Sequence, residues 1–168
     1  MRQLVLTRAI ATVGYLGFAP VAAGTVASAA AVAAGYLLHR LGGFPLLALA
    51  TVVAYCLGIW ATRVETFEME DLDPGFIVID EVVGMWIALM PLSLGLWHAG
   101  APPGLFPWPG WVAGFLLFRL FDIWKPWPVS WADRRKGPMG VMLDDVLAGA
   151  MAAVLVTLAA AVAHGWLA

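Results

Sequence analysis

Residues 77–97 decide the fold class, and they read IVIDEVVGMWIALMPLSLGLW. Asp80 and Glu81 are followed by no charged residue before Arg119. An apolar segment of about 20 residues is long enough to cross the hydrocarbon core of a bilayer as a helix. The stretch is therefore predicted to be a membrane-spanning helix that begins with two adjacent carboxylates.

The rest of the chain contains further stretches without Asp, Glu, Lys or Arg. A long one, 82–118, exceeds a single crossing, and its segment APPGLFPWPG at 101–110 is rich in residues that end helices, which predicts a turn. We therefore expect an all-α fold, a polytopic membrane helix bundle with about five spanning or re-entrant helices. The expected helices are 16–38, 43–62, 77–97, 108–124 and 145–166.

The composition supports one membrane domain and no separate soluble domain. Of the 168 residues, 62% are apolar and 12% are charged, whereas soluble domains carry about a quarter charged residues. We expect a single domain over 1–168, and no nucleic-acid partner. The basic start MRQLVLTR precedes an apolar run that is too long for a removable signal peptide, so it is interpreted as part of a retained span.

The charges indicate an orientation in the membrane. With five crossings, the amino terminus and the loops 63–80 and 125–144 lie on one face. All Lys and Arg except Arg40 fall on or near that face, which the positive-inside rule assigns to the cytoplasm. All 11 acidic residues fall there too. The positive-inside rule does not constrain the position of Asp and Glu, so their gathering at this face is expected to have a chemical reason.

Two pairs of adjacent carboxylates precede apolar runs: Asp80 with Glu81, and Asp144 with Asp145. The structural alternative for each pair is the start of a helix, where a carboxylate gains about 0.3–1 kcal/mol from the helix dipole. The functional interpretation is a metal site, because Mg²⁺ prefers a few carboxylate ligands together with water and substrate phosphate. The predicted ligands are these four residues, with Asp73 as a further candidate.

Arg119 and Asp122 lie three residues apart, on one face of an apolar helix. Ionisable groups at membrane depth are costly and usually functional, although a structural ion pair is the alternative here. Asp122 joins Asp80, Glu81, Asp144 and Asp145 as a candidate catalytic carboxylate.

Three residues are predicted to bind substrate phosphate. Arg119 offers a bidentate fork and Lys125 a point charge. Thr25 offers a hydroxyl beside Gly24, although a glycine among small residues more often means helix packing, and Lys125 has the alternative of snorkelling to the interface. Because His39, His98 and His164 belong to the opposite face, hydrolysis by a metal-activated water is favoured over a phosphohistidine.

At these residues the sequence resembles the phosphatidylglycerophosphatase A family. The matching segments are APVAAGT at 19–25, DPGFIVIDEVVGMW at 73–86, FRLFDIWKPWP at 118–128 and GVMLDDVLAG at 140–149. The resemblance implies a magnesium-dependent enzyme of the bacterial inner membrane that converts phosphatidylglycerophosphate to phosphatidylglycerol. It also implies metal and catalytic roles for the five carboxylates. Ala23 departs from the proline that the family usually has before Gly-Thr.

The competing interpretation is a membrane transporter or ion channel, since intramembrane Arg and Asp residues also line ion paths. A transport path should continue across the bilayer. Here the charges are expected at one face only, which favours the enzyme. Gly84 and Gly149 are predicted to be packing contacts between the third and fifth spans.

Overall fold

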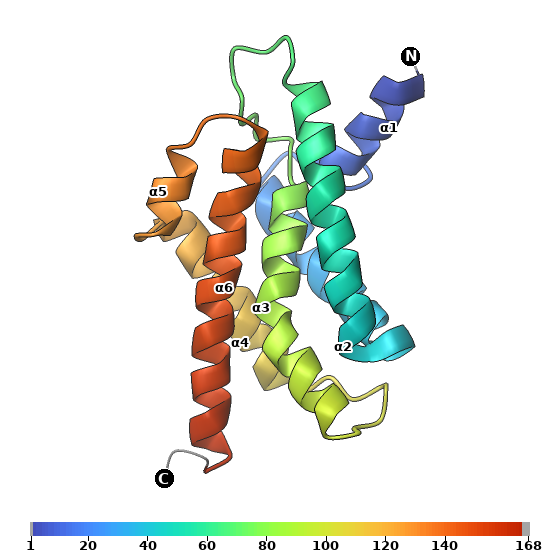
Figure 1. Ribbon diagram of the computed structural model, residues 1–168, viewed down its shortest axis with the longest axis vertical. Coiled ribbons are helices and arrows are strands. Elements are labelled where there is room, and N and C mark those ends of the chain that lie inside the picture. The colour runs from blue at the N-terminus through green and yellow to red at the C-terminus, as the bar shows by residue number, and fades with distance from the viewer. Residues whose placement is uncertain (1, 166–168) are drawn as a thin grey trace.

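The computed structural model describes the backbone of residues 2–165 and the side chains of residues 4–165, and within these limits it contains no strand. The predicted all-helical class is confirmed, and Trp166, expected at the end of the last span, lies outside the described residues. The elements are α1 (Arg2–Ala11), the short 3₁₀ helix η1 (Leu16–Phe18), α2 (Ala23–Glu65), α3 (Ile79–His98), α4 (Trp108–Trp124), α5 (Val129–Asp133) and α6 (Pro138–Ala163) (Figure 1).

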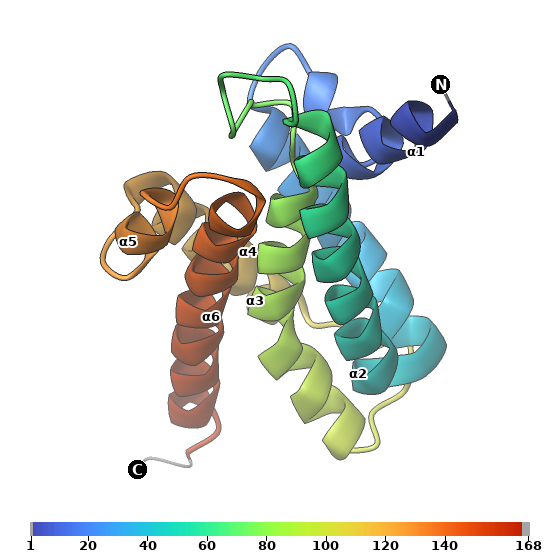
Figure 2. The ribbon, with the colours of Figure 1, turned by 45° about the horizontal axis from the view of Figure 1, so that its top comes forward.

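The long helix α2 consists of two antiparallel arms, 23–41 and 44–65. Its backbone is non-helical at Gly42 (φ −152°) and Gly43 (φ 64°). A straight helix of 43 residues would be about 65 Å long. Instead, Ser28 and Gly58 both lie at the start of α3, since Ser28 hydrogen-bonds Glu81 and a Cβ on Gly58 would stand 3.3 Å from Ile79. The chain therefore reverses at the glycine pair (Figures 1 and 2), and the two arms match the first two predicted spans.

Three helices, α2, α3 and α6, are long and apolar enough to cross a membrane. The 17-residue α4 packs against α3 and α6 and keeps the predicted bounds of the fourth span. Counting the two arms of α2 separately, these segments form the expected bundle.

The first predicted span began too early. Residues 12–22 form turns and η1 rather than a helix, and Ala22 has left-handed backbone geometry (φ 50°), so the spanning helix begins at Ala23. The amino-terminal residues are also not part of that span, because they form the separate helix α1. This helix is fixed to the end of α2, where Glu65 accepts hydrogen bonds from Thr7 (2.7 Å) and from Arg8 Nε (2.5 Å).

The last predicted span began too late. Helix α6 starts at Pro138, which suits the first turn because proline needs no hydrogen-bond partner for its nitrogen. Asp144 and Asp145 therefore lie inside the helix, and the alternative that they cap its start is wrong. The short helix α5 was not predicted.

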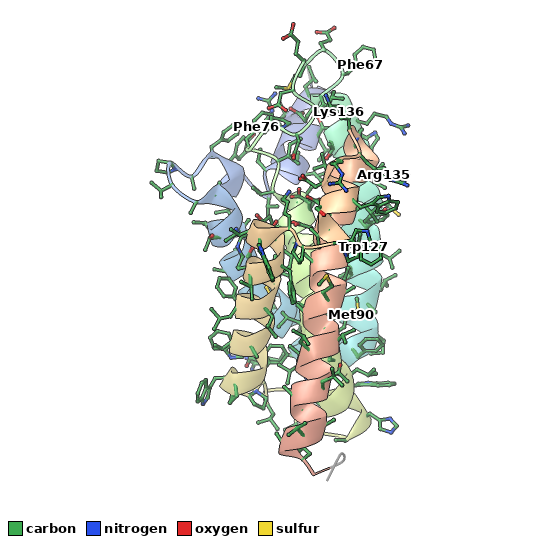
Figure 3. All side chains as sticks on the ribbon, turned by 90° about the vertical axis from the view of Figure 1, so that its left-hand side faces the viewer. Phe67, Phe76, Met90, Trp127, Arg135 and Lys136 are labelled. Atoms are coloured by element: carbon green, nitrogen blue, oxygen red, sulfur yellow. The ribbon has the colours of Figure 1, made fainter. Side chains whose placement is uncertain are left out.

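The charged side chains gather at one end of the bundle, called here the polar end: α1, the 66–78 loop, the 125–137 segment and the adjoining helix ends. Figure 3 shows this end, which carries Phe67 and Lys136. Arg40 is at the other end, beside the α2 turn, and His39 bonds Ser93 far along α3 (2.8 Å). In the described part of the chain, the charges do not extend along the bundle as a transport path would require.

Helices α3 and α6 are in direct backbone contact. A Cβ on Gly149 would overlap the backbone of Gly84, and a Cβ on Gly84 would lie 2.6 Å from the carbonyl oxygen of Asp145. The predicted packing role of both glycines is confirmed. This close approach brings the two carboxylate pairs to the same level of the bundle.

Candidate active site at the polar end of the bundle

The two pairs of carboxylates lie near the starts of α3 and α6, where Asp80, Asp144 and Asp145 are buried and Glu81 is partly buried. Asp80 and Glu81 occupy the first turn of α3, and Asp144 and Asp145 follow the first turn of α6. Asp80, Asp144 and Asp145 are 8%, 6% and 3% exposed, respectively. In each pair the first carboxylate accepts the backbone N–H of the second, at 2.9 Å for Asp80 and 3.0 Å for Asp144. This hydrogen bond fixes the orientation of the first carboxylate in each pair.

Asp145 lies at the centre of this group. Its carboxylate interacts electrostatically with those of Asp80, Glu81, Asp122 and Asp144. These residues come from α3, α4 and α6, so the fold brings together all five carboxylates that the sequence singled out. Like charges this close together favour a bound cation or proton.

Arg119, in the last turns of α4, pairs with carboxylates of two helices, α3 and α4, and lies close to a serine of α2. Its Nη1 donates to Glu81, pairs with Asp122 at 2.8 Å and lies 3.4 Å from Ser28 Oγ. Its Nε is buried and has no hydrogen-bond partner among the described residues. The guanidinium is therefore oriented by carboxylates on one side and retains an unused buried donor.

Ser28 was missed by sequence reasoning. Its hydroxyl donates to Glu81 Oε2 at 2.8 Å and also lies 2.8 Å from the carbonyl oxygen of Gly24. A lone serine in an alanine-rich helix carries no sequence signal for a site. Its role appears only once α2 and α3 are placed side by side.

Gly24 allows the start of α2 to approach the site. A Cβ at this position would collide with the carboxylate of Glu81 and stand 3.4 Å from Arg119 Nη1. Thr25 is its neighbour in the chain, but no hydrogen bond within the described residues joins its hydroxyl to the carboxylates or to Arg119. The phosphate-binding role of Thr25 stays a prediction.

Lys125 ends α4 in left-handed geometry (φ 49°) and reaches across to α6. Its Nζ pairs with Asp144 Oδ2 at 2.8 Å and with Asp133, a partner that sequence reasoning did not identify. Burial alone would lower the pKa of the Lys125 ammonium, but the hydrogen bonds to Asp133 and Asp144 outweigh it and raise the pKa above its ordinary value. Lys125 is therefore a cation at neutral pH.

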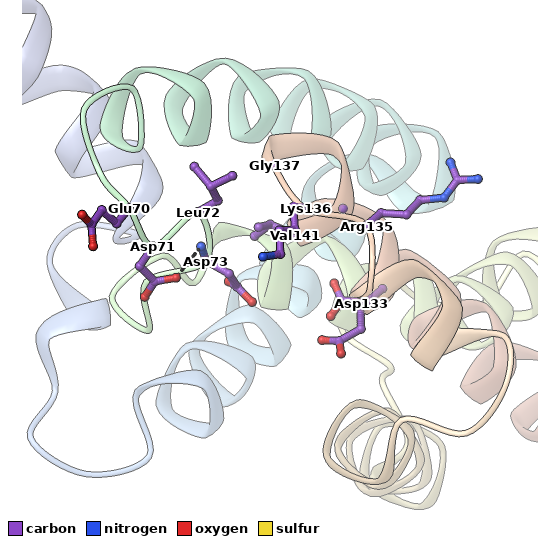
Figure 4. A pocket seen from close by; sticks show the side chains of 11 residues that line it. Glu70, Asp71, Leu72, Asp73, Asp133, Arg135, Lys136, Gly137 and Val141 are labelled. Carbon is purple, nitrogen blue, oxygen red and sulfur yellow. Dashed lines mark hydrogen bonds between the residues drawn. The ribbon is translucent and has the colours of Figure 1, made fainter.

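A pocket of about 220 Å³ lies beside Asp144, between the 66–78 loop, the 125–137 segment and the start of α6 (Figure 4). Asp73, Asp133, Lys136 and Asp144 are among its lining residues. Burial raises the pKa of the Asp73 carboxyl, while the nearby Lys125 acts in the opposite direction. Because Asp144 belongs both to the pocket and to the carboxylate group, the pocket adjoins the site.

The described residues contain no group of three Asp, Glu, His or Cys side chains arranged to hold a metal ion. The donor chemistry nevertheless fits magnesium. Five carboxylates face the two cations Arg119 and Lys125, and within the described chain neither Asp80 nor Asp145 pairs with a basic residue. Buried oxygen ligands with an excess of negative charge suit Mg²⁺, provided that the carboxylates turn toward a common centre.

Comparison with known proteins identifies the family of the chain. The family model described as phosphatidylglycerophosphatase A matches residues 9–160, a range that contains every candidate site residue. The Escherichia coli protein named phosphatidylglycerophosphatase A is 37% identical over 152 residues, covering 89% of this chain and 79% of the relative. The Haemophilus influenzae protein of the same name is 36% identical over 136 residues, covering 80% and 77%.

A third relative carries a different name. The Bacteroides thetaiotaomicron protein named putative phosphatidylinositol-3-phosphatase is 38% identical over 149 residues, covering 85% of this chain and 86% of the relative. No solved structure matches the chain. The family model and the relatives cover nearly the whole bundle, and the chain belongs to the phosphatidylglycerophosphatase A family.

Proposed function

We propose that the protein hydrolyses the phosphomonoester of phosphatidylglycerophosphate and releases phosphatidylglycerol and phosphate. One observation carries the proposal: at the polar end of an apolar bundle, an arginine with an unused buried donor pairs with carboxylates of α3 and α4, and the buried Asp144 and Asp145 of α6 belong to the same group. A substrate phosphate can reach this end while its acyl chains stay among the helices or in the bilayer. The names of two relatives support the same substrate.

The side chains divide into three roles. Arg119 binds phosphate oxygens through the donors that Glu81 and Asp122 leave unused, and these two carboxylates fix the plane of its guanidinium. Lys125 holds Asp144 in place and adds positive charge beside the phosphate. Asp80 and Asp145, with Glu81, Asp144 and the nearby Asp73, form the ligand set proposed for Mg²⁺.

When bound, magnesium supplies an acidified water and neutralises charge on the leaving oxygen. The protein contributes the orientation of the phosphate and a water-poor surrounding on the helix side of the site. Asp80 and Asp145 are buried and form no salt bridge with a basic residue of the described chain, which leaves their carboxylates for the metal.

The direct test is phosphate release from phosphatidylglycerophosphate by the purified protein in detergent, with Mg²⁺ and then with excess EDTA. Release that requires the metal and stops with EDTA is expected. Phosphatidylinositol 3-phosphate is assayed in parallel, because the name of the Bacteroides relative specifies it. Faster release from the inositol lipid would make that lipid the proposed substrate. No release from either lipid would refute lipid phosphatase activity.

We also propose that the protein resides in the bacterial inner membrane with its polar end in the cytoplasm, in accord with the positive-inside rule. The exposed native cysteine Cys56 is first replaced by serine. A single cysteine at Lys136 should then react with a membrane-impermeant reagent only from the cytoplasm. A cysteine at Gly104 should react only from the periplasm. The reverse pattern would contradict the orientation and leave the chemistry of the site untouched.

A further inference from the structure

A second cavity, of about 540 Å³, lies between the first arm of α2 and α4. Its walls are Ala29, Ala33 and Tyr36 on α2 and Trp111 and Phe115 on α4, and Phe106 from the preceding loop also lines it. None of its lining residues is charged. This apolar groove falls within the range of about 300–1,000 Å³ that small-molecule sites occupy.

The apolar groove begins where the candidate active site ends. Val32, which also lines the groove, lies four residues after Ser28, about one helical turn further along the same side of α2. The Ser28 hydroxyl contacts Glu81 and lies near Arg119. On the other wall, Phe115 lies four residues before Arg119, about one helical turn away on the same side of α4. From Ser28 to Tyr36 the helix rises about 12 Å. The groove is therefore a continuation of the site into the apolar part of the bundle.

The far end of the groove is narrowed by aromatic rings, and one side is open. The ring centroids of Tyr36 and Phe106 are 5.6 Å apart. Along the α2 wall, Ala29 and Ala33 are exposed at the surface of the bundle. The small alanine side chains leave space that a larger residue would fill. An occupant would enter from the side and extend away from the polar end.

We propose that this groove binds the upper part of one acyl chain of the lipid substrate. The inference rests on the proposed function, because a phosphate held by Arg119 is joined through its glycerol to chains that must pass into an apolar region. The groove begins about one helical turn from Arg119, is apolar along its length and is open on one side. Its α2 wall and its α4 wall together set the direction in which the chain leaves the site.

The test fills the groove. In Ala33→Trp, an indole occupies the space between α2 and α4, and Val154→Trp places the same residue at an exposed position on α6 that is outside the groove. Both variants are assayed on phosphatidylglycerophosphate with two oleoyl chains and with two hexanoyl chains. For Ala33→Trp, the ratio of kcat/KM for the long-chain lipid to that for the short-chain lipid should fall about tenfold. For Val154→Trp the ratio should stay at the wild-type value.

Photochemical labelling gives a second measurement that does not require turnover. A phosphatidylglycerophosphate analogue with a diazirine at the middle of one acyl chain is irradiated with the wild-type protein. Labels are expected on 29–36 and 111–115, competed by unlabelled phosphatidylglycerophosphate and not by phosphatidylcholine, and lost in Ala33→Trp. Labels spread equally over α6, or unchanged in Ala33→Trp, would overturn the proposal.

The experiments distinguish a failure of the groove proposal from a failure of the proposed function. If the wild-type protein releases phosphate and Ala33→Trp keeps the wild-type chain-length ratio, the groove proposal is wrong and the proposed function stands. If Ala33→Trp is inactive on both lipids, the labelling pattern of the wild-type protein decides. If the wild-type protein releases no phosphate from either lipid, the proposed function fails, and labelling that the substrate lipid does not compete refutes the groove as well.

Discussion

The carboxylate pairs of α3 and α6 have the same arrangement: in each pair one carboxylate forms a salt bridge with a basic residue and the other does not. In one pair, Glu81 pairs with Arg119, and in the other, Asp144 pairs with Lys125. The remaining member of each pair, Asp80 or Asp145, is buried without a basic partner in the described chain. Each helix start therefore supplies one carboxylate that orients a cation of the protein and one that is left for a cation from outside.

The burial of a carboxylate in the site and its salt bridge to a basic residue are therefore separate properties. A buried charge without a partner costs several kcal/mol, which a structural role would not repay. A paired carboxylate, by contrast, is accounted for by the arginine or lysine that it holds. The comparison therefore ranks Asp80 and Asp145 above Glu81 and Asp144 as metal ligands, a ranking that the following variants test.

The largest effect is expected from Asp80→Asn and Asp145→Asn. Each should lower turnover by about 100-fold or more, because a metal ligand is lost. Neither should lower the midpoint of thermal unfolding in EDTA, since each removes a buried charge that has no partner. Phosphate release and thermal unfolding in detergent measure the two effects.

The matched controls are Glu81→Gln and Asp144→Asn. These also reduce turnover, but each removes one of the two carboxylates that pair with Arg119 or with Lys125, so the unfolding midpoint should fall. If all four variants unfold at the same temperature, the distinction between paired and unpaired carboxylates is wrong. Near-normal turnover in Asp80→Asn or Asp145→Asn would remove that residue from the ligand set.

The next effect is expected from Arg119→Lys. Lysine keeps the charge but loses the planar fork and the buried Nε donor, so kcat/KM should fall by about 10- to 100-fold, which corresponds to about 1.5–3 kcal/mol for hydrogen bonds to charged groups. Arg40→Lys, at the other end of the bundle, is the control and should retain full activity. Wild-type kcat/KM in Arg119→Lys would mean that the arginine acts only as a positive charge.

The sequence was sufficient to predict the helical class, the turn at 101–110 and the five carboxylates, because each depends on local composition. Charge-free stretches of spanning length indicate helices, and adjacent acids at the edges of such stretches indicate a site. The start of α6 was misplaced because the first turn of that helix, PMGVML, has no recognisable cap residue and follows the basic segment DRRKG. Helix α6 therefore includes Asp144 and Asp145, and of these two only Asp144 forms a salt bridge across the bundle, with Lys125.

Other parts of the site depend on packing that no single segment encodes. Ser28 and Asp133 become site residues only because α2 meets α3 and the 125–137 segment folds back toward α6. The separate helix α1 was also missed, since its attachment depends on Glu65, far away in the sequence. The roles of Thr25 and of magnesium stay predictions.

A smaller effect is expected from Gly149→Ala. The added Cβ would overlap the backbone of Gly84 and push α6 away from α3, at a cost of about 1–3 kcal/mol in stability. Thermal unfolding should shift downward and turnover should fall several-fold as the two pairs separate. Gly95→Ala is the control, because its Cβ would meet no atom within 4 Å. Equal stability of both variants would show that the two helices can separate without cost.

The smallest effect is expected from Ser28→Ala. The variant removes the hydroxyl that donates to Glu81 Oε2, while the shorter contact from Arg119 to the same oxygen remains. Losing one such hydrogen bond costs about 0.5–1.5 kcal/mol, so kcat/KM should fall about 2- to 10-fold.

Ser93→Ala is the matched control, because Ser93 is buried and bonded to His39 away from the site. It should lower the unfolding temperature without changing kcat/KM. If both variants change stability alone, Ser28 supports the fold and Arg119 by itself fixes Glu81. If only Ser28→Ala changes kcat/KM, the first arm of α2 is part of the active site, which is the arrangement that a lipid chain leaving along α2 requires.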